Sequence, residues 1–295
     1  MYEDSRQWKQ LFLDIYQSFE TNLEATMQFQ DEEDLHQARV DLRKLVTMLE
    51  VLILEDTAEQ DPIKQCYRAL KKLLKQLGKL RDWDVFHLEV SAIGEKWKGK
   101  NKQELKRGLL TVIDYHRQMI RVDLLMKMPN LHNQEFNRVW RQAITMKFLS
   151  TKLADVNINN SYTALVDDFL TQYDTFKKTA LKKGIDQPES IEALHEVRLT
   201  SKKLRYTGKY LDFALHEATN RDVKGYKKTQ EYLGNVNDYS NYLERLKSLQ
   251  KKFPYLKCTS TKRVETNIEK KLSKAFDGLN KEMKRHKNKN GKASN

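Results

Sequence analysis

The chain repeats itself, and this internal duplication limits the possible folds more than any other feature of its 295 residues. The segment LHQARVDLRKLVTML (35–49) returns as LHEVRLTSKKLRYTG (194–208), and QLGKLRDWD (76–84) returns as YLGNVNDYS (232–240), in the same order. A repeat of this kind indicates that one supersecondary unit is used twice. The alignments equate His36 with His195, Arg39 with Arg198, Arg43 with Lys202, Lys44 with Lys203, Gly78 with Gly234, and Asp82 with Asp238.

Each half is predicted to contain four helices. Only 10 glycines and 4 prolines interrupt the chain, which favours long helices over hairpins. Apolar residues recur at helical steps, as at Leu109, Val112 and Ile113, and strand patterns are nearly absent. Asp61 before Pro62 is typical of an N-cap and first helical residue. The expected helices are 5–28, 34–55, 63–97 and 101–128, then 161–184, 189–216, 221–250 and 260–286, with a bridging amphipathic segment at 134–152.

The predicted class is therefore all-α, with a first helical repeat at 1–155 and a second at 156–286. The basic residues 287–295 are expected to form a disordered tail. A break in the helix 63–97, near Gly78–Asp82, stays open. Gly78 and Gly234 are interpreted as kinks or close-packing points rather than as phosphate-binding loops.

Basic residues form rows along the helices, and this is unusual because like charges at helical spacing cost about 0.2–0.5 kcal/mol per pair. Steps of three and four residues place each row on one helix face. The His-bearing row is rich in the second half, whereas the first half has Val46 and Glu50 at the matching places. The more basic row of the second half is His195, Arg198, Lys202, Arg205 and Lys209. The more basic row of the first half is Arg68, Lys72, Lys75 and Lys79. Lys224 and Lys228 are the second-half counterparts of this first-half row.

These rows have two interpretations. They could be ordinary solvated faces, but such faces usually mix signs because oppositely charged pairs at i,i+4 stabilise helices. The rows here are nearly all positive and occur in both halves, and the chain has a net charge of +13 and a pI near 9.4. A positive protein of this kind favours polyanionic partners. We therefore favour an anion-binding site.

Other kinds of site fit the sequence less well. A zinc site needs three or four His, Cys or carboxylate ligands, and the neighbours of His36 and His195 are cations that repel a metal ion. Cys66 and Cys258 lack metal-binding spacing, so a reduced, intracellular environment is expected. No signal peptide or membrane span is predicted, which indicates a cytoplasmic protein. Asp82 and Asp238 are interpreted either as partners of the histidines or as helix caps, as in Arg81-Asp82-Trp83-Asp84.

The paired blocks resemble the CHAD family, the conserved histidine α-helical domain. The resemblance lies in LHQARVDLRK with QLGKLRDWDVF, and in LHEVRLTSKKLRY with YLGNVNDYSNYLERL, and extends over about residues 5–286. It implies two four-helix bundles related by a pseudo-twofold axis. It also implies binding of inorganic polyphosphate in a central basic groove, and association with polyphosphate granules.

The resemblance further implies which residues would line the groove. The second helix pair departs from the family pattern at Glu231, Asn235 and Asn237, so the two halves are expected to share the ligand unevenly. The Glu-x-Glu-x-Lys motif of a triphosphatase domain, which some relatives carry, is missing. The implied groove residues are His36, Arg39, Arg43, Lys44, Arg68, Lys72, Lys75, Lys79, His195, Arg198, Lys202, Lys203, Arg205, Lys224 and Lys228.

The leading functional hypothesis is a non-catalytic polyphosphate-binding protein that needs no cofactor. Phosphate or sulfate ions could occupy the groove, and granule proteins are possible partners. A nucleic-acid-binding protein is the alternative, disfavoured because the rows carry few aromatics beyond Tyr206 and Tyr210. A phosphate-transferring enzyme is a third hypothesis, disfavoured because the only repeated acids are Asp82 and Asp238, without a carboxylate cluster to hold a divalent metal.

Overall fold

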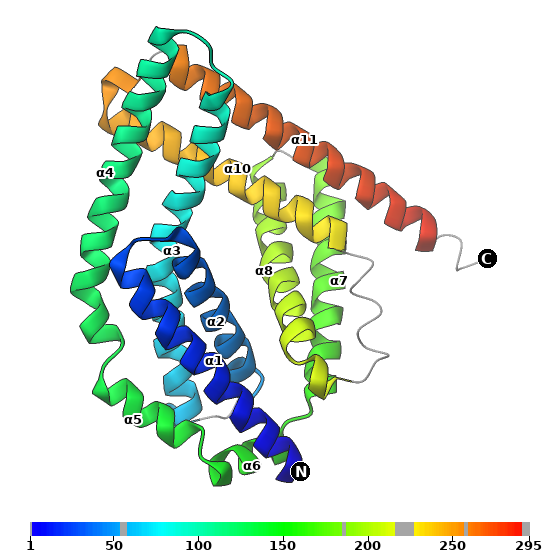
Figure 1. The fold of residues 1–295 in the computed structure, drawn as a ribbon. Coiled ribbons are helices and arrows are strands. Elements are labelled where there is room, and N and C mark those ends of the chain that lie inside the picture. The colour runs from blue at the N-terminus through cyan, green and yellow to red at the C-terminus, as the bar shows by residue number, and fades with distance from the viewer. Residues whose placement is uncertain (1, 54–57, 185–186, 216–226, 257–258, 291–295) are drawn as a thin grey trace. The chain divides into compact units, whose positions relative to one another are not determined.

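The computed structural model describes residues 2–53, 58–184, 187–215, 227–256 and 259–290, and within them it contains helices and no strand (Figure 1). The all-α prediction is confirmed. The first repeat holds α1 (Tyr2–Gln28), α2 (Glu32–Glu50), α3 (Pro62–Glu95) and α4 (Lys100–Leu131), followed by α5 (Gln134–Ala143) and α6 (Met146–Asp155). The second holds α7 (Ile158–Lys183), α8 (Pro188–Tyr210), η1 (Asp212–Ala214), α10 (Lys227–Lys252), η2 (Pro254–Leu256) and α11 (Thr259–Asn290).

Local capping explains several helix boundaries. The Asp61 carboxylate accepts a hydrogen bond from the backbone N–H of Ile63 at 2.9 Å, and Pro62 is the first residue of α3, as the sequence predicts. Asp31 caps α2 in the same way, accepting from the N–H of Glu33 at 2.8 Å. Pro129 differs from expectation because it lies inside the last turn of α4 rather than beyond its end.

Four other expectations need correction. The bridging segment is two helices rather than one, because the chain turns at Ile144 and Thr145 between α5 and α6. Helix α3 runs unbroken, so Asp82 does not cap a helix start. Helix α2 ends at Glu50 and α8 at Tyr210, earlier than expected. Helix α11 continues to Asn290, which makes 287–290 helical instead of a disordered tail; the remaining tail residues lie outside the described part.

The chain forms two compact units that are interleaved along the sequence. The first contains Met1–Leu88, Thr111–Ser161 and Lys209–Ala214; the second contains Glu89–Leu110, Tyr162–Gly208 and Leu215–Asn295. The ends of α3 and α4 that meet at their connection thus group with the second unit, and the last residues of α8 group with the first. The units therefore do not follow the two sequence repeats.

Each unit has its own apolar core. In the first unit α1 supplies a column of buried aromatic residues, and Tyr16 stacks on Trp140 with ring centroids 4.5 Å apart. In the second unit α7 buries Tyr162, Phe169 and Phe176 almost completely. Within the described residues, no helix has both the length and the apolar character needed to cross a membrane.

A buried ion-pair network fixes α2, α3 and α4 in the first unit. Arg117 on α4 donates from Nε to Asp84 on α3 at 2.8 Å, and Asp84 is only 1% exposed. The same guanidinium contacts Glu32 at the start of α2 and donates to Asp114 at 2.9 Å. Desolvation raises the pKa of Asp84 even though Arg117 opposes it. This network holds the helices that carry the first-half basic residues.

Candidate anion-binding site

Helices α2 and α3 pair antiparallel, and their contact sets the geometry of the first-half site. Tyr67 near the start of α3 donates to Glu50 at the end of α2 at 3.1 Å. Further along α3, the backbone oxygen of Leu74 accepts from Arg39 Nη1 at 3.2 Å. The face of α2 that carries Arg39 is therefore turned toward α3.

The charges of three nearby arginines act on the His36 imidazole. Burial, followed by the charge of Arg81 on α3, lowers the pKa of the His36 imidazole. Arg43 and Arg39 on α2 act in the same direction, and Glu33 opposes them. We call His36, Arg39, Arg43 and Arg81 the His36 cluster. It is a place where a bound anion would meet several positive groups at once.

Arg39 fits this cluster because Gly78 has no side chain. A Cβ at Gly78 would lie 2.6 Å from Arg39 Nη1, and Arg39 is only 9% exposed. The close-packing interpretation of Gly78 is thus confirmed. Gly234 differs, because no described atom lies within 4 Å of a Cβ built there, and α10 continues through it.

Lys44, the next residue on α2 after Arg43, is anchored by Asp41. Its Nζ lies 2.8 Å from Oδ1 of Asp41, whose side chain is nearly fully buried. The other oxygen, Oδ2, accepts hydrogen bonds from Ser18 at 2.7 Å and Asn22 at 3.0 Å on α1. Asp41 therefore fixes the position of Lys44 while removing part of its net charge.

The basic row on α3 divides into a paired end and an open end. Arg68 contacts the Glu59 carboxylate, and Lys64 binds the same group at 2.7 Å. Their hydrogen bonds, that of Arg68 first, lower the pKa of Glu59 to about 2. Lys72, Lys75 and Lys79 are all exposed. The open end of the row thus holds most of the charge available to a ligand.

The second-half residues lie on α8 and α10 of the other unit. His195, Lys203 and Arg205 are exposed, and Arg198 and Lys202 are half-buried. Asp238 approaches Arg198 Nη2 at 3.8 Å, so among the described contacts this repeated aspartate faces an arginine rather than a histidine. Lys228 is exposed near the start of α10, and Lys224 lies outside the described residues.

Sequence reasoning missed several residues that shape these surfaces. Arg81 could have been found, because it lies three residues after Gly78 and so shares the α3 face that meets α2. The roles of Glu59 and Asp41 could not have been found from the sequence. The effect of Glu59 depends on the position of a loop, and that of Asp41 depends on packing against α1.

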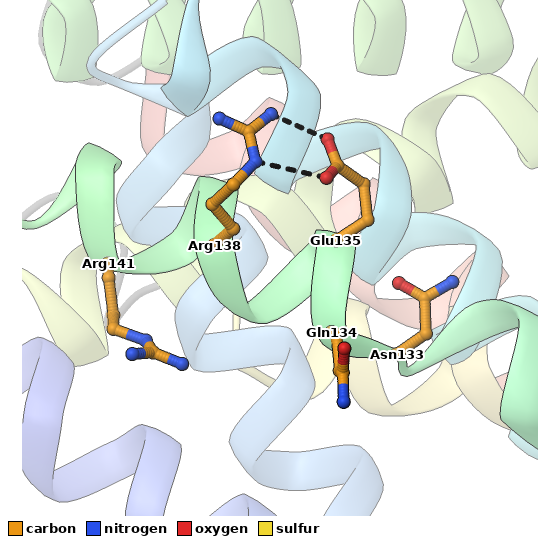
Figure 2. Close-up of a pocket in the computed structure, with 5 residues that line it drawn as sticks. All are labelled: Asn133, Gln134, Glu135, Arg138 and Arg141. Atoms are coloured by element: carbon orange, nitrogen blue, oxygen red, sulfur yellow. Dashed lines mark hydrogen bonds and ion pairs between the residues drawn. The ribbon is translucent and has the colours of Figure 1, made fainter.

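A pocket lies at the start of α5 and includes none of the predicted site residues (Figure 2).

This pocket is an open hollow of about 850 Å³ lined by Asn133, Gln134, Glu135, Arg138 and Arg141. Arg138 donates to both carboxylate oxygens of Glu135, at 3.0 and 2.7 Å (Figure 2). This pair leaves little net charge for an anion on that wall. Across the described part of the chain, no three His, Cys, Asp or Glu side chains group in a way that could hold a metal ion.

Comparison with known proteins adds two findings. The family model described as CHAD domain matches residues 10–247. The crystal structure of the CHAD domain from the plant Ricinus communis is similar with a TM-score of 0.62 at 19% identity, covering 95% of this chain and 91% of that one. A search of curated proteins finds no match.

Proposed function

Because the chain belongs to the CHAD family, we propose that it binds inorganic polyphosphate through the basic residues of its two repeats, without catalysis. The observation that carries the proposal is the nearly buried Arg39, held between α2 and α3 by the Leu74 carbonyl beside Gly78, with the charges of Arg81 and Arg43 acting on the neighbouring His36. Gathered positive charge costs free energy in the unliganded protein, and an anion at the cluster relieves that cost. Exposed Lys72, Lys75 and Lys79 extend the positive surface along α3.

The residue types suit a flexible chain of phosphates. Arginine presents a planar fork of donors that matches two phosphate oxygens, whereas lysine acts as a point charge that tolerates many geometries. Binding releases the counterions condensed on the polyanion, so affinity is expected to fall steeply with salt. The arginines near His36 would bind phosphate oxygens in a fixed geometry, and the lysines along α3 would form contacts that adapt to the conformation of the chain.

The non-catalytic part of the proposal rests on the acids. Phosphoryl transfer generally uses carboxylates to hold divalent metal ions beside the reacting phosphate. Of the two repeated acids, Asp238 lies 3.8 Å from Arg198 Nη2. The buried Asp84, two residues after the repeated Asp82, is bound by Arg117. The proposal also includes a groove shared by the two repeats, a cytoplasmic location, and recruitment to polyphosphate granules.

A thermal-shift experiment tests the proposal directly. Long-chain inorganic polyphosphate is expected to raise the Tm of the full chain at low salt, because a ligand that binds only the folded state stabilises it by mass action. The shift should shrink as salt rises. An unchanged Tm at low salt would contradict the proposal. RNA that displaces polyphosphate at equal phosphate concentration would instead support nucleic-acid binding.

Paired variants then locate the site. Arg43→Gln combined with Arg81→Gln removes two charges from the His36 cluster and is expected to weaken polyphosphate binding strongly. Arg138→Gln is the matched control, since this exposed arginine lies at the α5 hollow and pairs with Glu135. Equal affinities for the double variant and the control would exclude the His36 cluster as the binding site.

A further inference from the structure

The last residues of α8 are firmly held in the first compact unit. Lys209–Ala214 group with this unit although the preceding residues of α8 group with the other. Leu211 is fully buried, and the Phe213 ring meets the buried Trp8 ring of α1 edge-on, with centroids 5.4 Å apart. Tyr210 therefore stands on a backbone fixed by the residues that follow it.

The Tyr210 ring lies next to two ammonium groups that come from different repeats. Lys209 Nζ is 5.4 Å from the ring centroid, and Lys44 Nζ from α2 is 5.9 Å from the same centroid. Both distances are within the range of cation–π attraction. One aromatic ring thus holds a cation of the second-half basic row and a cation of the first repeat.

Lys44 has a second restraint that Lys209 lacks in the described contacts. Asp41 binds Lys44 Nζ at 2.8 Å and is itself held by Ser18 and Asn22. With Asp41 at one contact and Tyr210 at another, the long Lys44 side chain is limited to few rotamers. A phosphate that binds there has less side-chain entropy to remove than at a freely moving lysine.

We propose that Tyr210 is a positioning residue for polyphosphate, holding Lys44 and Lys209 together as one phosphate subsite to which both sequence repeats contribute a cation. This inference rests on the proposed function. The aromatic ring attracts both ammonium groups without adding a negative charge to the one that Asp41 already places beside Lys44. Tyr210 does not contact the bound phosphate itself in this scheme; it acts through the two lysines.

The experiment compares the polyphosphate affinity of the wild-type chain with those of Tyr210→Leu and Tyr210→Phe by calorimetric titration at low salt. Tyr210→Leu is expected to weaken binding about three- to tenfold, as the loss of one or two exposed cation–π contacts predicts. Tyr210→Phe keeps the ring and is expected to bind like the wild type. Tyr115→Leu on α4 is the matched control, because Tyr115 is an exposed tyrosine of the same unit outside the basic rows.

The outcomes separate this inference from the proposed function. A wild type that does not bind polyphosphate overturns both. If the wild type binds polyphosphate and Tyr210→Leu binds it with the same affinity, only the role of Tyr210 is overturned. The same conclusion follows if Tyr210→Leu and Tyr210→Phe weaken polyphosphate binding equally. If Tyr210→Leu reduces stability, Lys44→Gln is introduced into both the Tyr210→Phe and the Tyr210→Leu variants. Lys44→Gln should then lower the polyphosphate affinity more in Tyr210→Phe, where the ring is present, than in Tyr210→Leu. An equal Lys44→Gln effect in both backgrounds overturns the inference.

Discussion

The guanidinium of Arg39 occupies the space that a side chain on Gly78 would need. Arg39 Nη1 lies 2.6 Å from the position of a Cβ at Gly78 and donates to the backbone oxygen of Leu74 at 3.2 Å. This fit places a nearly buried cation at the seam between α2 and α3. It also makes the two equivalent glycines of the repeats, Gly78 and Gly234, a natural pair for comparison.

Alanine substitutions at these glycines are expected to have opposite effects. Gly78→Ala should lower the free energy of unfolding by about 1 kcal/mol, because loss of the buried Arg39 hydrogen bond outweighs the gain in helix propensity. Gly234→Ala meets no described atom and should raise the free energy of unfolding by about 0.5–1 kcal/mol. Urea denaturation measures both. Stabilisation by Gly78→Ala would show that Arg39 moves aside without cost.

The His36 cluster predicts a pH dependence of stability. The folded-state pKa of His36 is lowered from 6.5, so below that value the unfolded chain binds more protons at this residue than the folded protein does. The His36 contribution should therefore favour the folded state less as the pH falls from 6.5 through the folded-state pKa, and remain constant above 6.5. Comparing the pH profile of Tm for the wild type with that for His36→Gln measures this contribution, and identical slopes below pH 6.5 would contradict it.

Polyphosphate should act on the same histidine in the opposite direction. A bound anion offsets the charges of Arg39, Arg43 and Arg81, so it is expected to raise the pKa of His36 toward or above its ordinary value. Binding near pH 6 should then take up protons and tighten as the pH falls. Calorimetric titrations in two buffers of different ionisation enthalpy detect the proton uptake, and His36→Gln should reduce it.

Removing Arg117 is expected to destabilise the first unit severely. Arg117→Met leaves Asp84 buried without its arginine, which should cost about 3–5 kcal/mol of unfolding free energy. Adding Asp84→Leu to Arg117→Met should recover part of the loss, because the uncompensated carboxylate is then gone. Guanidinium chloride midpoints test this, with Arg138→Met as a surface control that should leave the midpoint unchanged. A double variant no more stable than Arg117→Met would contradict the explanation.

Each exposed lysine of the α3 row should contribute to the salt dependence of polyphosphate binding. Lys75→Gln is expected to reduce the slope of log affinity against log salt by about 0.7, the value for one contact to a single-stranded polyanion. Lys178→Gln on α7 provides the control, because this lysine pairs with Asp174 at 2.8 Å on a mixed-sign surface. Equal slopes for the two variants would indicate that Lys75 does not contact the ligand.

The sequence predicts local features of this protein well where one residue acts on its own helix. Pro62 begins α3 and Asp61 caps it because both effects depend only on neighbouring residues. The placement of Arg81 beside His36 depends instead on the register of two helices, and the Tyr210 contact with Lys44 depends on segments far apart in the chain. Tyr210 was also hidden from a repeat-based search, because Val51 occupies the matching place in the first half.

The interleaving of the two units has a consequence for the autonomy of the duplicated halves. Val90, Ile93 and Leu109 are buried, and all three belong to the Glu89–Leu110 stretch that groups with residues from the second half. A polypeptide severed after Asp155 would separate these apolar side chains from the rest of their compact unit. Each fragment would then lack part of a compact unit, so cleavage between the two repeats is expected to destabilise both units.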